Sequence, residues 1–319
     1  TTTLVATFDA SVITPTFTSD TFSVSSDFHG SIQGSLSFPV GETITLPPRE
    51  VVFDPTADFM PGELVQTTIT TDVIVGGHPL SRPYVWQFRT AVSGGAGTYV
   101  DSLQRLGNGQ TWGVALGDLD ADGDLDAFVA NKAIPPLKAS NTVWFNEGGA
   151  QEGAPGTFVD SGQRLGYSDY EAVALGDLDG DGDLDAFVGK ADEGGCEAWF
   201  NDGAGYFPIS RTLVSHNNSV AVALGDVDGD GDLDAVVANR ASQPDKGNWG
   251  VEGNNLWLNQ GGLQRGTPGS FISQTLEITS TRSIALGDVD GDGDLDAFMA
   301  RWGPNQVWLN HKGVFTDSG

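Results

Sequence analysis

The sequence predicts an all-β protein, a β-sandwich followed by β-propeller-type blades, and three observations support this. Helical periodicity is nearly absent, and short alternating or β-branched runs are separated by Gly, Pro, Asn and Asp. Residues 1–92 contain several such runs, at roughly the spacing of a sandwich. From residue 98 onward, an acidic motif occurs four times at intervals of 59, 49 and 62 residues, which indicates one supersecondary unit per repeat.

The first domain is predicted over residues 1–92. Its expected strands lie at 3–8, 21–25, 31–38, 50–53, 64–71 and 84–90. In the last of these, Tyr84, Trp86 and Phe88 alternate with polar residues and are expected on the core face. The segments 52–55 (VFDP), 61–63 (PGE) and 86–90 (WQFRT) resemble those of the bacterial Ig-like domains of surface proteins. This resemblance implies an Ig-like sandwich, and residues 93–97 (SGGAG) are predicted to form a flexible linker.

The second domain is predicted over residues 98–319 and consists of repeats with three shared elements. The acidic element lies at 115–127, 174–186, 223–235 and 285–297. A Trp-Phe/Leu-Asn element follows at 144–146, 199–201, 257–259 and 308–310, and a Gly-x-Phe element at 156–158, 205–207, 269–271 and 313–315. We predict strand A before each acidic loop, strand B after it, strand C at the Trp and strand D at the Phe. Four antiparallel strands repeated radially make propeller blades.

Each acidic loop reads Asp-x-Asp-x-Asp-Gly-Asp-Leu-Asp, a pattern suited to Ca²⁺. Carboxylates at positions 1, 3 and 5 converge when the loop curls, and the Gly at position 6 permits the sharp turn. We expect side-chain ligands from positions 1, 3, 5 and 9, with position 9 bidentate, and the backbone carbonyl of position 7. The predicted metal-binding residues are Asp118, Asp120, Asp122, Asp124, Asp126, Asp177, Asp179, Asp181, Asp183, Asp185, Asp226, Asp228, Asp230, Asp232, Asp234, Asp288, Asp290, Asp292, Asp294 and Asp296. About four Ca²⁺ are expected, one per loop.

Two other interpretations of the loops are disfavoured. An EF-hand needs a bidentate Glu at position 12, and here that position falls within an apolar run, at Val129, Val188, Val237 and Met299. The second disfavoured interpretation is an acidic turn that is simply solvated and binds no metal ion. The loops hold 20 of the 43 acidic residues, and carboxylates packed so densely repel one another without a counter-ion.

These loops, at all four positions, are similar to those of FG-GAP or VCBS repeats, which build integrin α-type propellers and many bacterial surface proteins. The resemblance covers residues 98–319 and implies that calcium binds between strands A and B. That fold usually closes with seven blades, whereas four units are found here. The propeller is therefore small, incomplete or cut from a longer chain. Because the sequence begins with Thr1 rather than Met, we expect a processed protein or a piece of a longer one.

A fifth D-like segment suggests assembly. Residues 97–102 and 313–318 both match the D-strand pattern, so the chain has five D-like segments but four A–C sets. An unpaired strand recruits another chain. We hypothesise head-to-tail assembly through this spare strand into a homo-oligomer or filament. The alternative is that residues 314–318 lead into further repeats.

Composition excludes several functions. The formal charge is −28, with 15 Lys+Arg against 43 Asp+Glu, which argues against nucleic acid and anionic membrane surfaces. No apolar run is long enough for membrane insertion, and Cys196 has no partner cysteine for an intramolecular disulfide. No catalytic motif is found. The sequence therefore predicts a non-enzymatic, secreted or cell-surface structural or adhesive protein whose partners are copies of itself, surface proteins or glycans. The alternative is a carbohydrate-binding module or a calcium-dependent polysaccharide lyase.

Overall fold

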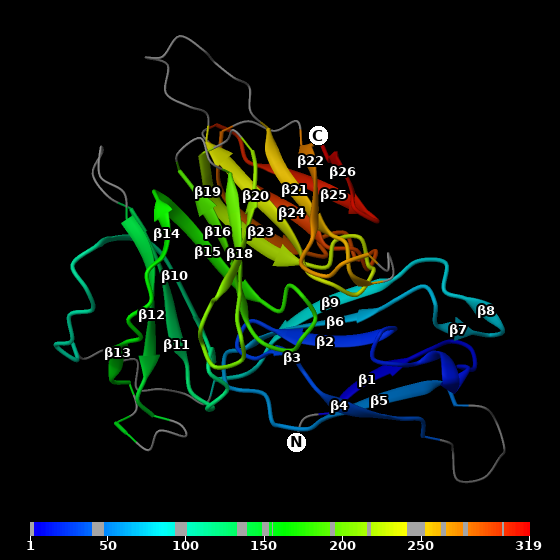
Figure 1. The fold of residues 1–319 in the computed structure, drawn as a ribbon. Coiled ribbons are helices and arrows are strands. Elements are labelled where there is room, and N and C mark those ends of the chain that lie inside the picture. The colour runs from blue at the N-terminus through cyan, green and yellow to red at the C-terminus, as the bar shows by residue number, and fades with distance from the viewer. Residues whose placement is uncertain are drawn as a thin grey trace.

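The computed structural model describes residues 3–39, 48–92, 101–132, 139–148, 153–154, 156–191, 195–215, 218–240, 253–262, 266–276, 280–301 and 303–319. These residues form antiparallel sheets and one short 3-10 helix, Thr14–Thr16, which confirms the predicted all-β fold. The linker predicted at 93–97 lies outside the described residues. Figure 1 shows a sandwich (blue and cyan) lying beneath a fan of sheets (green to red).

The N-terminal part is a sandwich of two sheets with strand orders β1-β5-β4 and β3-β2-β6-β9, and β7 and β8 form a separate ribbon. Its strands are β1 (Leu4–Thr7), β2 (Phe22–Ser26), β3 (Gly30–Ser31), β4 (Gly34–Ser37), β5 (Glu50–Pro55), β6 (Leu64–Ile69), β7 (Ile74–Val75), β8 (His78–Pro79) and β9 (Tyr84–Arg89). Alternation along β2 and β5 buries Phe22, Val24, Val51 and Phe53 in one core cluster.

Strand β9 only partly follows the prediction. Trp86 and Phe88 pack against the sandwich core, as predicted. The prediction for Tyr84 is wrong: its side chain is exposed, and the Arg82 guanidinium lies 5.2 Å from the ring centroid. Tyr84 is the first residue of the strand and lies beside Gly293 of an acidic loop, beyond the core.

Four further antiparallel sheets, here called blades 1 to 4, follow in chain order. The A strands are β10 (Gln110–Gly117), β15 (Tyr170–Gly176), β19 (Asn218–Gly225) and β23 (Thr281–Gly287). The B strands are β11 (Asp126–Lys132), β16 (Asp185–Lys190), β20 (Asp234–Arg240) and β24 (Asp296–Arg301). The C strands are β12 (Ala139–Asn146), β17 (Cys196–Phe200), β21 (Asn254–Asn259) and β25 (Gln306–His311). The D strands are β13 (Phe158–Asp160), β18 (Ile209–Leu213), β22 (Phe271–Leu276) and β26 (Val314–Asp317), and β14 (Leu165–Ser168) also pairs with β12.

Each blade has the same register, which confirms the four-strand unit. The last A-strand residue pairs with the first B-strand residue, as in Gly117 with Asp126, and the B-strand Ala127 pairs with the C-strand Trp144. The D strand of blade 4 is β26, which pairs with β25 from Val314 to Asp317. Of the N-terminal D-like segment, residues 97–100 lie outside the described residues, and 101–102 form no strand.

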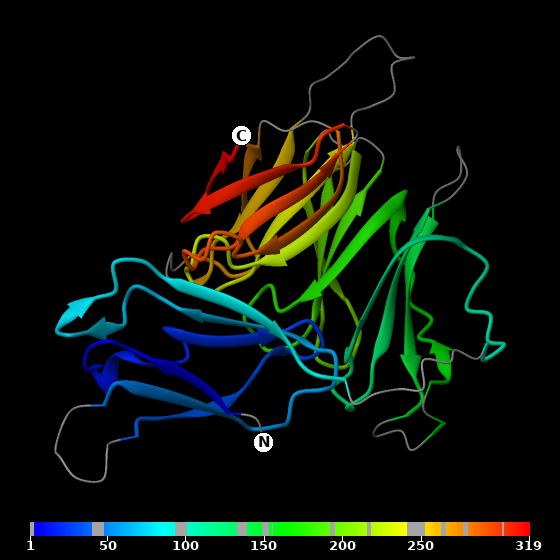
Figure 2. The ribbon, with the colours of Figure 1, turned by 180° about the vertical axis from the view of Figure 1, so that it is seen from behind.

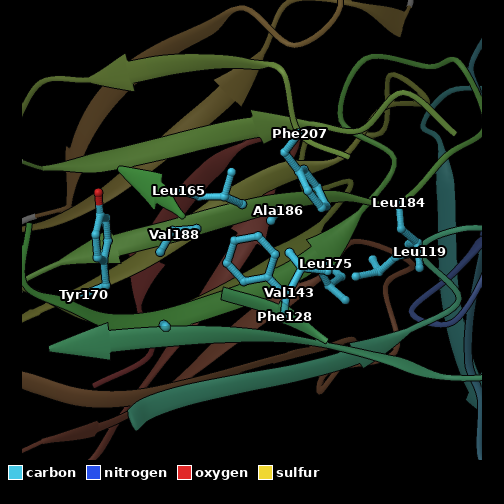
Figure 3. Close-up of a cluster of buried hydrophobic side chains, with 11 residues drawn as sticks. Leu119, Phe128, Val143, Leu165, Tyr170, Leu175, Leu184, Ala186, Val188 and Phe207 are labelled. Carbon is cyan, nitrogen blue, oxygen red and sulfur yellow. The ribbon is translucent and has the colours of Figure 1, made fainter. Parts of the chain in front are cut away.

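The blades stack side by side through their A strands, in the order β10, β15, β19 and β23. Both views show an open arc with blade 1 at one end and blade 4 at the other (Figures 1 and 2). Apolar residues of neighbouring blades interlock between them, as Figure 3 shows for Phe128 and Val143 of blade 1 against Leu175 and Ala186 of blade 2. The C-strand tryptophans of blades 2 to 4 pack in these clusters. Among the described residues, no helix is long and apolar enough to cross a membrane.

Candidate metal centres

An acidic loop joins strand A to strand B in every blade, and its glycine turns it. In blade 1 the loop runs from Asp118 to Asp126, the first residue of β11. The predicted turn at position 6 is confirmed, because φ is positive at Gly123 (98°), Gly182 (104°), Gly231 (106°) and Gly293 (94°).

The first aspartate of each loop holds the loop in its curled form. Asp118 accepts hydrogen bonds from the backbone N–H groups of Asp122 (3.1 Å) and Gly123 (3.0 Å). Asp177, Asp226 and Asp288 likewise accept backbone N–H groups of their own loops, those at positions 4 and 6. These hydrogen bonds fix the position 1 carboxylate relative to the backbone of its loop.

The curled loops bring carboxylates together. In each of four groups, one oxygen per residue lies within 4.8 Å of the others. The groups are Asp118, Asp120 and Asp122; Asp177, Asp179 and Asp185; Asp226, Asp228 and Asp230; and Asp288, Asp290 and Asp292. Three of them use positions 1, 3 and 5, and the blade 2 group uses positions 1, 3 and 9.

The ninth aspartate has a second task besides the one predicted. Asp126 is fully buried, and its two oxygens accept the N–H groups of Leu119 (2.9 Å) and Asn146 (2.8 Å). Asp185, Asp234 and Asp296 make the same pair of bonds. This residue therefore ties its loop to the start of the C–D turn. A carboxylate has about four lone-pair sites, so each oxygen can still accept a cation.

The seventh aspartate contributes no oxygen to these four groups. In each loop its backbone N–H donates to the position 5 carboxylate, at 3.0–3.2 Å. In blade 4 the Asp294 carboxylate accepts the N–H of Lys312 (3.3 Å) and lies 3.3 Å from His311 Nδ1. The carbonyl predicted as the position 7 ligand stays a prediction.

Burial makes these carboxylates difficult to ionise without a cation. Desolvation is the largest cause in each case: it raises the pKa of Asp118 and Asp177 to about 6, of Asp226 to about 7 and of Asp185 to about 8. In blade 3, desolvation and neighbouring aspartates together raise the pKa of Asp230 to about 10. The folded chain therefore holds negative charge in places that favour either a proton or a metal ion.

Asp230 shows most clearly that the loops fit a cation. Its side chain is 6% exposed, and Oδ1 accepts the N–H of Asp232 at 3.2 Å. Oδ2 is buried and accepts no hydrogen bond from any described residue. A buried charged oxygen without a partner is costly. The donor set is all oxygen, which suits Ca²⁺ or Mg²⁺ rather than a thiolate- or imidazole-binding metal.

The sandwich lies directly against the ends of the blades that carry the acidic loops (Figure 2). The sequence did not predict this arrangement. Blade 1 donates the Asp118 N–H to Phe28 O (2.9 Å), and blade 4 accepts the Val85 N–H at Gly293 O (2.8 Å). Asp226, the first aspartate of the blade 3 loop, accepts a hydrogen bond from the Thr68 hydroxyl at 2.8 Å.

Further contacts complete this joint. In blade 2, Gly182 O lies so close to Gly30 that a Cβ there would be 2.9 Å away. Val85 of β9 is 2% exposed because it packs with Val227 and Leu295 of blades 3 and 4. All four acidic loops therefore touch the sandwich.

In blades 2 to 4, the Asn that ends the C-strand Trp-Phe/Leu-Asn element links its blade to the preceding one. The Asn201 amide donates to Leu184 O (3.1 Å) in its own loop and to Leu119 O (2.8 Å) in the preceding blade. Asn259 and Asn310 repeat this bridge. The strict recurrence of Asn at this position was the available signal.

Comparisons with known proteins fit part of this description. The model of the FG-GAP-like repeat family matches residues 177–237, which span blade 2 from its acidic loop into strand B of blade 3. No curated protein matches the chain. A solved structure of an Agrocybe aegerita lectin, described as recognising non-reducing terminal N-acetylglucosamine, is 17% identical with a TM-score of 0.39. The match covers 91% of this chain and 65% of the lectin chain, so this chain spans about two thirds of the lectin's length.

Proposed function

We propose that the chain is a non-enzymatic, extracellular calcium-binding protein with a structural or adhesive role at a microbial cell surface, matrix or filament. In this proposal residues 1–92 form an Ig-like module and residues 98–319 form FG-GAP-type blades, each of which binds one Ca²⁺. The FG-GAP-like match at 177–237 supports the repeat assignment. The observation that carries the calcium proposal is the buried, unpartnered carboxylate oxygen of Asp230 within a group of three converging aspartates.

Calcium fits the donor set of these loops. Ca²⁺ takes six to eight oxygen ligands from carboxylates, backbone carbonyls and water. The side chains at positions 1, 3, 5 and 9 would hold it, with the carbonyl of position 7. A bound divalent ion would favour the charged form of carboxylates whose pKa burial raises.

The proposed role of the ions is to hold the fold together. Each loop connects strand A to strand B, its ninth aspartate ties it to the C–D turn, and the loops of all four blades touch the sandwich. Cys196 is the only cysteine, so no disulfide within the chain supports these joints. Metal ions often replace disulfides in this task.

The proposed partners are other copies of the chain, surface proteins or glycans. The charge of −28 disfavours polyanions such as nucleic acid. Secretion is consistent with this assignment, since millimolar extracellular calcium would fill sites of modest affinity.

Thermal unfolding with and without chelator tests the proposal. A site kept a thousandfold above its dissociation constant adds about 4 kcal/mol of stability. We therefore expect EDTA to lower Tm by roughly 5–10 °C or more, and excess Ca²⁺ to restore it. Equimolar Mg²⁺ is the matched control and should restore less. An unchanged melting curve in EDTA would show that the loops do not hold calcium as structural sites.

A further inference from the structure

At each junction between neighbouring blades, two leucine side chains of one blade fill the space beside a glycine of the blade before it. We call this space the glycine socket. A Cβ added at Gly117, at the end of strand A in blade 1, would lie 2.5 Å from Leu184 Cδ1 and 3.0 Å from Leu175 Cδ1 of blade 2. The same fit recurs at Gly176 with two leucines of blade 3 and at Gly225 with two leucines of blade 4. The glycine is needed at each place because leucine side chains of the next blade fill the space of a Cβ.

The fourth socket has no occupant among the described residues. Gly287 holds the equivalent position in blade 4, and a Cβ added there would meet nothing within 4 Å. The equivalent leucines of blade 1 are Leu116 and Leu125, and no described blade precedes them. Among the described residues, one glycine therefore lacks its leucines, and one pair of leucines lacks its glycine.

Around Gly287, apolar side chains are exposed whose equivalents in the other blades are buried. Val289 is 56% exposed, whereas its equivalents Leu119, Leu178 and Val227 are 1–2% exposed. Phe298 is 44% exposed, and its equivalents Phe128, Phe187 and Val236 are fully buried. We call Gly287, Val289 and Phe298 the blade 4 end face.

The opposite end of the arc is its complement. Val114 is 60% exposed and Leu116 is 46% exposed, whereas the equivalents of Leu116 in blades 2 to 4 are buried or half-buried. Trp144 lines a cavity of about 280 Å³ instead of packing against another blade, as the tryptophans of blades 2 to 4 do. We call Val114, Leu116, Leu125 and Trp144 the blade 1 end face.

The polar inter-blade bridge is also incomplete at this end. Asn201, Asn259 and Asn310 each donate to two carbonyls, one of them in the preceding blade. Within the described part of the chain, the Asn146 amide donates to one blade carbonyl, that of Leu125 in its own loop at 3.3 Å. The carbonyl that would complete the bridge corresponds to that of Val289 in blade 4.

The chain enters blade 1 as if it came from a preceding blade. Gln104 donates to Gly156 O (2.6 Å) and accepts the Phe158 N–H (2.9 Å). Gln163, which links blade 1 to blade 2, makes the same two contacts with Gly205 and Phe207. Blade 1 is therefore built at both its entry and its end face to follow another blade.

We propose that the blade 4 end face of one copy of this chain binds the blade 1 end face of a second copy, head to tail. The contact would reproduce the interface that the chain already forms between its own blades three times. Such an interface is heterologous, so it yields a ring if the rotation closes and an open filament if it does not. This inference rests on the self-assembling role proposed above, but it assigns the contact to blade faces rather than to a spare strand.

The D edge is separate from this contact. Residues 97–102 and 313–318 carry the same D-strand pattern, so only one of the two segments can fill the D edge of blade 4 at a joint. In this structure β26 fills it.

Two substitutions, each on a different end face, test the contact in saturating Ca²⁺. Phe298→Asp introduces a charge on the blade 4 end face, and Leu116→Asp does so on the blade 1 end face. Sedimentation velocity over a concentration series should show association of the wild type, weakened about tenfold or more by either change. Gly287→Leu places a side chain at this position, where a Cβ meets nothing within 4 Å in the monomer, and should have the same effect. Val5→Asp, at a side chain 53% exposed on the sandwich, is the matched control and should associate like the wild type.

Mixing the variants identifies the geometry. Phe298→Asp retains a working blade 1 end face, and Leu116→Asp retains a working blade 4 end face. A mixture should therefore form a one-to-one complex that neither variant forms alone. A wild type that stays monomeric at hundreds of micromolar, association unaffected by both changes, or a mixture without complex would each overturn the proposal.

Calcium titration of the same variants separates this inference from the proposed function. All of them should bind calcium with wild-type stoichiometry, because none of the changed residues is a predicted ligand. Normal calcium binding without assembly would refute only the head-to-tail contact. Loss of calcium binding in the wild type itself would refute the proposed function.

Discussion

Substitution of Asp230 gives the sharpest test of the proposed metal site. In the metal-free chain its buried charge is unfavourable, because desolvation and its neighbours raise its pKa to about 10. With Ca²⁺ bound, the same carboxylate becomes a ligand.

The variant Asp230→Asn should therefore change stability in opposite directions in the two states. In EDTA it should raise Tm, because the folded wild type must either bury this carboxylate as a charge or take up a proton to neutralise it, and the amide needs neither. In Ca²⁺ it should lower Tm relative to the wild type and weaken binding at one site. Melting curves in both buffers provide the measurement, with Asp54→Asn, at an exposed position of β5 in the sandwich, as control. Equal destabilisation in both buffers would mean that Asp230 has a purely structural role.

The pH dependence of the metal-free chain follows from the same carboxylates. Burial raises the folded-state pKa of Asp118 to about 6, of Asp226 to about 7 and of Asp185 to about 8, above the ordinary value of 3.8. The folded chain then binds more protons than the unfolded chain, so stability in EDTA should rise as pH falls from about 8 toward about 4. Saturating Ca²⁺ should flatten or reverse this trend, because protons and metal compete. Urea midpoints at several pH values measure it, and greater stability at pH 8 than at pH 5 in EDTA would contradict the account.

The C strands of blades 2 to 4 each connect to the preceding blade through one side chain. Asn259 donates to Leu178 O in blade 2 (2.8 Å) and to Leu233 O in its own loop (3.2 Å). Both carbonyls would lose this donor in Asn259→Ala. Leaving buried polar groups unsatisfied costs about 1–3 kcal/mol each.

Asn259→Ala should therefore destabilise the calcium-loaded protein by about 2 kcal/mol or more. Asn146→Ala is the matched control: it ends the same kind of strand but donates to one blade carbonyl, so it should cost clearly less. Urea unfolding of both variants in Ca²⁺ gives the comparison. If the two variants lose equal stability, the bridge between blades does not contribute as described.

The sequence predicted what is local and repeated. Strands A to C and the turn at Gly123 follow from short motifs and occur where the pattern places them. The D strand of blade 2 begins at Ile209, two residues after the predicted Phe207. Contacts between distant segments were not predictable. Val85 points to the opposite face of β9 from Trp86, and nothing in the local sequence indicates that this face packs on Val227. Alternation alone also placed Tyr84 in the core, because the local pattern does not show where the core ends. The bridge made by Asn259 spans 81 residues and is invisible to a local pattern.

At the scale of the whole molecule, the sandwich and the blades meet at the acidic loops. Thr68 bonds directly to Asp226, Arg82 lies 3.6 Å from Asp292, and Lys312 donates to Ser81 O at 3.0 Å. A cavity of about 560 Å³ also lies between the sandwich and the loops of blades 2 and 3. The proposed calcium ions would thus stabilise each blade and its joint with the sandwich at once.

The number of calcium ions bound by the intact chain is the decisive test of the proposed calcium sites. Native mass spectrometry after exchange into calcium-containing buffer should give four Ca²⁺ per chain, with chelator removing them and lowering the melting temperature. Asp226→Asn, which alters the first position of the blade 3 loop, should reduce the count to three while the other loops stay filled. A wild-type chain that binds no Ca²⁺ at millimolar concentration, or whose count is unaffected by Asp226→Asn, would contradict the account.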